Sequence, residues 1–569
     1  MFPTPLLRAK HVPPGPHSRR FPFQLVLLMA AVIGVVWSNR PPSSSLAHCA
    51  NKSGRGAPHK AGGAAFQEAF ATLFAVEMQL LLNLSNEGPL PPKDAPHNLD
   101  DIISTVQSQG VNILFVSFRW MDQEPAPGAF DFRVMDYVQQ AVCSSGLQLI
   151  VILDARASPA WVFDQHPDAG LVDADGDVRK EISFSHGGAM QLLHAWHEAV
   201  LARLAAVNAS CVHSVSPTFN NQYETKYTQE RDAFQDYSPN TVALYRQYLR
   251  SIHGGIAHWN TRWGTKFADW ASFRPPPLHM HGPRWNDTLT DPSYWDWQHF
   301  RHHHIHAAHE HCCQHFAAHG FRCIMHFGEF FSANDAIYAS GSVFTLAASP
   351  WLDFIVVDSN FVTAAMLPND PRVVQLLLSA MKPFGKPVFF EGAFEEIKDP
   401  LVHRRAVELT VASGAHGIGF TNWLDRVGPT FFKDTLSGLS HISSAGPSVA
   451  ILTPYRSSCA FKGLGYTADG KRDPRDPVQD DLFACLDQVQ KAVLSLGGLQ
   501  IFGVPSMLLP VVHYFEQIWY LEPLVLLSGD ERTISRIQQR VVDLRVPFHS
   551  CLANRPQQQL VVAECCPSL

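Results

Sequence analysis

The chain has 569 residues, of which 46% are hydrophobic and 17% are charged, and its formal net charge at neutral pH is -7. This length exceeds what one ordinary hydrophobic core spans, so we expect two or more domains. The charge balance leaves no strongly basic surface, which argues against nucleic acid as a partner.

The amino terminus differs in composition from the rest of the chain. Residues 21–37 form an uncharged apolar run of 17 residues, which is at the short end for a transmembrane helix. Several basic residues precede it: Arg8, Lys10, Arg19 and Arg20. The positive-inside rule therefore keeps residues 1–20 cytosolic. Because no clear small-residue cleavage site follows, an uncleaved signal anchor is preferred over a removed signal peptide or an organelle transit sequence.

Residues 38–67 are rich in Pro, Ser, Gly and Lys and are predicted to be a stalk. The rest of the chain would then be lumenal or extracellular, in the Golgi or at the cell surface. Four glycosylation sequons agree with a glycoprotein of the secretory pathway: Asn51, Asn83, Asn208 and Asn286. The cysteines number eleven, so at least one is unpaired within the chain. In the vicinal pairs Cys312-Cys313 and Cys565-Cys566, each cysteine is expected to bond elsewhere or stay reduced.

Residues 68–440 contain a repeated pattern of short apolar runs, most of them separated by helical segments. The predicted strands cover residues 73–80, 111–118, 147–154, 212–219, 322–327, 353–358, 387–391 and 417–423. Continuous apolar runs of this length are typical of a parallel sheet buried on both faces. Eight such units predict a (β/α)8 TIM barrel with insertions. The longest insertion, about residues 256–300, follows the fourth strand and is expected to overhang the active face.

Residues 447–569 are predicted to form a smaller α/β domain. Residues 449–452 and 524–527 resemble strands, and residues 480–496 resemble a helix. The segment lacks a glycine-rich phosphate loop, which argues against nucleotide binding.

Two segments of the predicted barrel end in polar, carboxylate-bearing turns. They are residues 218–224 (TFNNQYE) and residues 386–392 (KPVFFEG). A parallel barrel presents its catalytic residues at the carboxyl ends of its strands. Two carboxylates that face each other across the barrel mouth are the machinery of glycoside hydrolysis.

Further motifs resemble glycoside hydrolase family 42, the β-galactosidase-like barrels. They are residues 118–132 (FRWMDQEPAPGAFDF), residues 159–161 (PAW) with Pro167 and residues 173–176 (DADG), and residues 245–249 with 260–265. The resemblance covers about residues 68–430 and, more weakly, the domain after residue 447. It implies a retaining hydrolase of β-galactosides that often trimerises through its second domain. It also implies an acid/base residue after the fourth strand and a nucleophile after the seventh.

By strand count, Glu391 occupies the nucleophile position and Gln222 the acid/base position. A glutamine cannot titrate, so departure of a poor leaving group would lose general acid catalysis, worth ~10²–10⁴-fold. Three interpretations stay open. The enzyme uses Glu224 instead, it is impaired or acts only on good leaving groups, or it is a carbohydrate-binding or scaffold barrel.

Other substrate-binding predictions follow from position at the barrel mouth. Arg119 would hydrogen-bond the nucleophile, with a structural ion pair as the alternative. Asn221 would bond the sugar 2-hydroxyl, and Trp423 would stack on a sugar ring unless it lies in the core. Three residues end the third and sixth strands, and each could contact substrate, cap a helix or bond backbone: Asp154, Asp358 and Asn360. Glu329 would be a spare carboxylate after the fifth strand.

A run of histidines lies in a predicted helix between residues 299 and 315. The pairs His302/His306 and His311/His315 have the i,i+4 spacing that permits zinc binding. No HExxH motif accompanies them, so a solvated, partly amphipathic helix is the preferred interpretation. The sequence therefore predicts no metal and no cofactor.

Overall fold

The computed structural model describes residues 68–73, 98–156, 158–219, 223–225, 227, 235–277, 291–328, 330–331, 339–358, 372–392, 397, 399–421, 423, 430–442, 448–455, 457, 477–493, 498–523, 526 and 528–551. The predicted anchor at residues 21–37 and the stalk lie outside them. Within the described part of the chain, no helix has both the length and the apolar character needed to cross a membrane.

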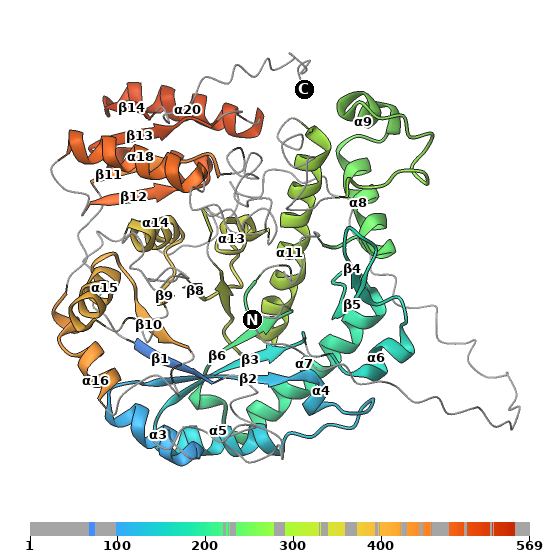
Figure 1. The fold of residues 1–569 in the computed structure, drawn as a ribbon, viewed down its shortest axis with the longest axis vertical. Coiled ribbons are helices and arrows are strands. Elements are labelled where there is room, and N and C mark those ends of the chain that lie inside the picture. The colour runs from blue at the N-terminus through green and yellow to red at the C-terminus, as the bar shows by residue number, and fades with distance from the viewer. Residues whose placement is uncertain are drawn as a thin grey trace, which may run out of the picture. The chain divides into compact units, whose positions relative to one another are not determined.

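Eight parallel strands form a sheet that curls into a barrel (Figure 1). In chain order the strands are β1 (Glu68–Leu73), β2 (Ile113–Arg119), β3 (Gln148–Asp154), β6 (Val212–Thr218), β7 (Ile324–Phe327), β8 (Phe354–Asp358), β9 (Val388–Glu391) and β10 (Gly417–Phe420). The spatial order is β6-β3-β2-β1-β10-β9-β8-β7. The two edge strands meet at a parallel bridge between Val215 and Cys323. The predicted barrel is therefore confirmed.

The predicted strands agree with the structure to within one to three residues at each end, except for the first. That strand was expected at residues 73–80, but β1 is Glu68–Leu73, so the prediction was wrong by about five residues. Residues 74–80 lie outside the described residues. The ring of Phe70 packs inside the barrel, 5.5 Å from the rings of both Phe115 and Phe389. The packing of this aromatic ring inside the barrel, rather than the more apolar run that follows it, therefore decides where the strand lies.

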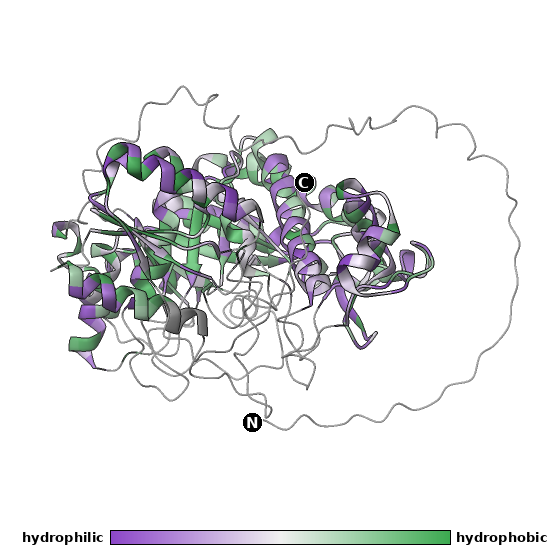
Figure 2. Cartoon of the chain, turned by 90° about the horizontal axis from the view of Figure 1, so that it is seen from above, coloured by the Kyte–Doolittle hydropathy of each residue, from purple (hydrophilic) through white to green (hydrophobic). Residues whose placement is uncertain are grey.

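Helices between the strands cover the outside of the barrel. They include α3 (Leu99–Ser108), α5 (Arg133–Ser145), α7 (Gly187–Asn208), α11 (Pro292–Ala318), α14 (Arg372–Met381) and α15 (Pro400–Ala412). In α3, the side chain of Asn98 caps the first turn, and Leu99, Ile102 and Val106 are buried. Figure 2 shows hydrophilic and hydrophobic residues alternating along the helices, as expected of helices with one buried face. Burial of these helical faces provides the core that holds the barrel.

The segments on either side of β6 form additional structure. The hairpin of β4 (Gly170–Val172) and β5 (Val178–Ile182) precedes it. The insertion after it includes α8 (Pro239–Ile252) and α9 (Ile256–Trp263). Aromatic residues of the insertion pack with the start of α11 in a separate cluster: Tyr245, Trp259, Trp263, Phe273, Tyr294, Trp297 and Phe300. The insertion therefore has its own small core.

A second, four-stranded parallel sheet follows the barrel. Its strands in spatial order are β12 (Leu499–Phe502), β11 (Val449–Leu452), β13 (Gln517–Leu521) and β14 (Phe548–Cys551). Its helices include α18 (Pro477–Ala492) and α20 (Ser528–Leu544). The predicted strand at residues 449–452 is confirmed, whereas residues 524–527 lie mostly outside the described residues. The ring of Tyr455 lies 4.4 Å from that of Phe344, so this sheet and the barrel share apolar contacts.

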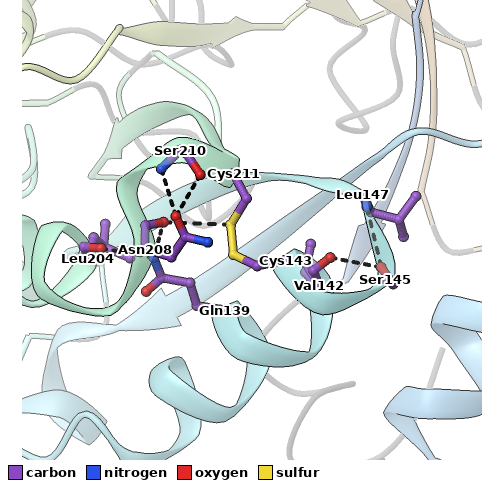
Figure 3. Close-up of a disulfide and its surroundings, with 9 residues drawn as sticks. All are labelled: Gln139, Val142, Cys143, Ser145, Leu147, Leu204, Asn208, Ser210 and Cys211. Atoms are coloured by element: carbon purple, nitrogen blue, oxygen red, sulfur yellow. Dashed lines mark hydrogen bonds between the residues drawn. A yellow bond between two sulfur atoms is a disulfide. The ribbon is translucent and has the colours of Figure 1, made fainter.

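Among the described residues, three disulfides join segments that are apart in sequence. They are Cys143–Cys211, Cys313–Cys323 and Cys485–Cys551. Figure 3 shows the first of them between α5 and the turn after α7, where Gln139 also donates to the carbonyls of Leu204 and Asn208. Cys312 is a buried free thiol. As predicted for this vicinal pair, Cys312 and Cys313 do not bond to each other.

Candidate active site

Three polar side chains meet at the carboxyl ends of neighbouring barrel strands. His326 is the next-to-last residue of β7, and Asp358 and Glu391 end β8 and β9. Asp358 and Glu391 are direct partners in the parallel register. Because all strands of the barrel are parallel, these residues share the rim where such barrels place their active sites. Glu391 is buried, with 3% of its surface exposed, among polar rather than only apolar neighbours.

His326 contacts the predicted nucleophile. Its Nε2 lies 3.5 Å from Oε2 of Glu391, and both side chains are buried. The imidazole thus limits the positions that the carboxylate can take. The sequence analysis did not single out His326. The available signal was one polar residue near the end of an otherwise apolar strand.

Glu224 also lies near this imidazole. Ligand atoms of Glu224, His326 and Asp358 lie within 4.8 Å of one another. The backbone N–H of Thr225 donates to the carbonyl of His326 over 2.6 Å, which fixes the segment to the end of β7. Both catalytic candidates, Glu224 and Glu391, therefore lie close to His326. Among the described residues, these three ligand groups are also the set that could hold a metal ion.

Gly328 makes room for the carboxylate of Glu224. A Cβ atom at Gly328 would lie 2.5 Å from Oε1, 2.8 Å from Cδ and 2.9 Å from Oε2 of Glu224. Contacts below 3.0 Å require one of the two groups to move. The placement of Glu224 therefore depends on a glycine about a hundred residues away in sequence.

Tyr223 directly precedes Glu224 and is buried in the barrel interior. Its φ of 61° is in the left-handed region, where a non-glycine residue is uncommon. Its side chain packs inside the barrel with Phe115 and Phe389. The guanidinium of Arg156 lies 5.5 Å from the ring centroid. Burial raises the pKa of Tyr223, so the phenol stays protonated at neutral pH. Sequence reasoning missed Tyr223, and we find no local signal for it.

Two residues that were predicted to bind substrate, Arg119 and Asp154, form hydrogen bonds with residues close to them in sequence. The Nε and Nη2 groups of Arg119 donate to Asp122 over 2.6 and 2.9 Å. This pair matches the alternative of a structural ion pair, and the bond from Arg119 to the nucleophile stays a prediction. Asp154 is fully buried and accepts from the backbone N–H of Arg156 over 3.1 Å.

Trp423 is buried, with 1% of its surface exposed, and its indole N–H donates to the carbonyl of Thr72 over 3.1 Å. Its ring packs against Phe432. These contacts match the core alternative, and the stacking role stays a prediction. Four other predicted residues lie outside the described residues: Asn221, Gln222, Glu329 and Asn360.

The histidine run forms most of α11, as predicted, but it is not simply a solvated face. His304 and His309 are buried. Nδ1 of His304 bonds the hydroxyl of Tyr227 over 2.9 Å, and its Nε2 bonds Ser185 over 2.8 Å. These two histidines therefore lie on the buried side of a partly amphipathic helix, which agrees with the expectation.

Comparison with known proteins relates part of the chain to one family. The profile of glycoside hydrolase family 42, described as β-galactosidase, matches residues 91–365, just under half of the chain. Over this segment the chain is similar to the family 42 β-galactosidases. Curated relatives include the β-galactosidase bgaB of Geobacillus kaustophilus, 23% identical over 223 residues that cover 38% of this chain and 31% of that protein. A β-galactosidase of Arthrobacter sp. is 28% identical over 175 residues, covering 30% and 24%. The matched region thus spans a third or less of these relatives.

Solved structures show the same fold as this β-galactosidase-like protein. The β-galactosidase from the psychrophilic Marinomonas ef1 superposes with a TM-score of 0.61 at 13% identity, covering 85% of this chain and 75% of that one. The β-galactosidase from the haloarchaeon Halorubrum lacusprofundi gives a TM-score of 0.61 at 14% identity, covering 84% and 71%. The family match includes Glu224, His326 and Asp358 but ends before Glu391. The assignment of Glu391 therefore depends on strand order.

Proposed function

We propose that this protein is a retaining glycoside hydrolase that acts on β-linked galactosides or related glycans, with Glu391 as the nucleophile. The observation that carries the proposal is the placement of Glu391 at the end of the seventh barrel strand, in contact with His326 and opposite Asp358. Family 42 relatives named as β-galactosidases support the substrate class.

The proposed reaction has two steps. First, an oxygen of Glu391 bonds to the anomeric carbon while the bond from that carbon to the leaving oxygen breaks, and the leaving oxygen takes up a proton. Second, a water loses a proton and its oxygen bonds to the anomeric carbon, which releases Glu391. The contact from His326 holds the nucleophile in place through both steps. The same acid/base group donates the first proton and accepts the second.

Glu224 is the described residue best placed to supply that acid/base group. Its carboxylate faces the same imidazole as the nucleophile, and its burial excludes bulk water. In a retaining mechanism the two carboxyl groups stand ~5–5.5 Å apart. Both carboxylates lie near the same imidazole, which supports this pairing.

A second candidate function is a catalytically impaired, carbohydrate-binding barrel. Gln222 favours it, because this residue occupies the position at which the family resemblance expects the acid/base carboxylate. A protein of this kind would keep sugar binding and the nucleophile but would turn over only substrates with good leaving groups.

Kinetics on two substrates test the proposal. The full chain should hydrolyse an activated nitrophenyl β-galactoside, and Glu391→Gln should lower kcat by at least about 10³-fold. Glu408→Gln, a surface carboxylate paired with Arg404, is the matched control and should keep full activity. Hydrolysis of lactose as well would favour the complete enzyme over the impaired barrel. Equal rates for wild type and Glu391→Gln would contradict the proposed nucleophile.

We also propose that the protein works in an oxidising compartment, as a lumenal or extracellular domain on an amino-terminal anchor, and that it forms trimers. The three disulfides support the oxidising environment, because such bonds persist in secreted and lumenal proteins. The anchor and the trimer depend on the sequence and the family resemblance alone.

A further inference from the structure

We infer that Asn208, at the end of α7, carries an N-linked oligosaccharide that extends from the end of the barrel opposite the candidate active site. This modification is made on surface segments of secreted and lumenal proteins. The lumenal or extracellular location proposed above is therefore a precondition. The proposed glycosidase reaction does not involve this end of the barrel.

Residues 208–210 (NAS) form an acceptor sequon on the protein surface. The sequon requires Asn, then any residue except Pro, then Ser or Thr. Asn208, Ala209 and Ser210 are all exposed. They join α7 to β6 through the short 3-10 helix η1 (Ala209–Cys211). A bulky polar chain can therefore leave the protein here without displacing buried side chains.

The hydrogen bonds of the sequon occupy the amide oxygen of Asn208 and leave the amide nitrogen available. Oδ1 accepts from the backbone N–H of Ser210 over 3.1 Å and from the Ser210 hydroxyl over 2.6 Å (Figure 3). Within the described part of the chain, Nδ2 donates no hydrogen bond to the protein. Nδ2 is the atom that carries the sugar, so folding does not engage it elsewhere.

The backbone of the sequon is held against α5 by contacts that a glycan would not disturb. The carbonyl of Asn208 accepts from Nε2 of Gln139 over 2.8 Å. Cys211, the last residue of η1, forms the disulfide with Cys143. Neither contact uses the side chain of Asn208. An oligosaccharide on Nδ2 therefore leaves the attachment of this turn to α5 intact.

The sequon lies away from the barrel mouth. It directly precedes Val212, the first residue of β6, whereas Asp358 and Glu391 are the last residues of β8 and β9. All strands of the barrel are parallel, so the start of β6 is at the face opposite the rim. An oligosaccharide at Asn208 therefore leaves the mouth open to substrate.

The modification is a group transfer from an activated sugar donor, an oligosaccharide carried on a lipid pyrophosphate. Nδ2 of Asn208 bonds to the anomeric carbon of the donor, and the bond from that carbon to the pyrophosphate oxygen breaks. The lipid pyrophosphate leaves, and Nδ2 loses one proton. No oxidant or reductant takes part.

Peptide mapping of the full chain, expressed in eukaryotic cells, tests the inference. An amidase that removes N-glycans, used in heavy-oxygen water, should convert Asn208 to a labelled aspartate. Asn208→Gln and Ser210→Ala should each lose this label, and Ser210→Thr should keep it. Ala209→Pro should lose it although both acceptor residues remain, and the φ of -66° at Ala209 suits proline.

An engineered sequon separates the site from the compartment. Gly438→Asn creates one with exposed Ser440, and Gly438 is itself exposed with a φ of 79°, which asparagine tolerates. This variant should be modified at both positions. Modification at position 438 or at other sequons without Asn208 would overturn the inference and leave the proposed compartment standing. Absence of any glycan, in the Gly438→Asn variant as well, would overturn both.

The kinetic effect of the glycan gives a further test. Asn208→Gln should hydrolyse a nitrophenyl β-galactoside with the kcat and KM of wild type, because the sequon and the rim lie at opposite ends of the barrel. Circular dichroism confirms that the variant folds. A fall in KM on removal of the glycan would show that the oligosaccharide reaches the mouth, and would overturn the placement inferred for it.

Discussion

Nε2 of His326 lies 3.5 Å from Oε2 of Glu391, at the end of two strands that are separated in the barrel by β8 alone. This contact makes His326 a positioning residue for the proposed nucleophile. The same imidazole lies near Glu224. One side chain therefore lies close to both groups on which the proposed reaction depends.

Replacing this imidazole tests its positioning role. His326→Gln should lower kcat by about 10- to 100-fold with little change in KM, because substrate binding stays while the carboxylate loses its constraint. His441→Gln, an exposed histidine outside the rim, is the control and should leave both constants unchanged. A rise in KM at constant kcat would show instead that His326 binds substrate.

Gly328 provides a test of the position of Glu224. Gly328→Ala places a Cβ atom 2.5 Å from Oε1 of Glu224, so the carboxylate must move. We expect kcat to fall by about 10-fold or more on a substrate with a poor leaving group, because general acid catalysis depends on this geometry. The melting temperature should change little, since the group that moves is the end of a side chain.

Gly187→Ala is the matched control, because a Cβ there meets nothing within 4 Å and the residue begins α7. It should keep full activity and gain up to about 1 kcal/mol of stability. Unchanged kinetics in Gly328→Ala would show that Glu224 takes no part in catalysis.

Substitution at two positions decides which residue supplies the proton. Glu224→Gln should lower kcat for lactose by ~10²–10⁴-fold and should have a much smaller effect on an activated aryl galactoside, which needs no proton donor. Gln222→Glu should restore activity in the Glu224→Gln background if the family position is still usable. A Glu224→Gln variant that cleaves lactose at the wild-type rate would exclude Glu224 as the acid/base residue.

Much of the fold could be predicted because the barrel strands are short, continuous apolar runs, which a parallel sheet buried on both faces requires. Glu391 could be placed because it directly follows such a run. The boundary of β1 was wrong because the packing of Phe70 against Phe115 and Phe389 is invisible in a local pattern.

The candidate site was less predictable, because its contacts join distant segments. The packing of Glu224 against Gly328 and the contact of His326 with Glu391 leave no trace in local sequence. Arg119 was assigned to the nucleophile from its strand position alone. Asp122 is only three residues away, on the turn that follows the strand, and its carboxylate accepts a hydrogen bond from the guanidinium.

The opposite end of the barrel carries a carboxylate that should influence acid stability. Glu68 begins β1, and its carboxylate lies 3.7 Å from Nε2 of His213 and 3.5 Å from that of His416. Burial alone would raise the pKa of Glu68, but the interactions with His213 and His416 outweigh it and lower the pKa to about 2. The unfolded chain, with an ordinary carboxyl, binds more protons in the acid range.

The stability from Glu68 is therefore complete above pH about 4.5 and is lost as the pH falls toward about 2. Glu68→Gln should be less stable than wild type at pH 6, and the difference should shrink between these two pH values. Urea unfolding at several pH values measures it, with Glu408→Gln as the surface control. A difference that stays constant down to pH 2 would contradict the ion-pair account.

The most direct test of the central claim is covalent labelling of the full chain with an activated 2-deoxy-2-fluoro-β-galactoside, followed by peptide mapping with mass spectrometry. Such a substrate traps the glycosyl-enzyme and needs no general acid, so it reports on the nucleophile whatever the state of Gln222. We predict one fluorogalactosyl group on Glu391 and none in Glu391→Gln. An adduct on another carboxylate, or an unlabelled Glu391 in a folded protein that hydrolyses galactosides, would contradict the account.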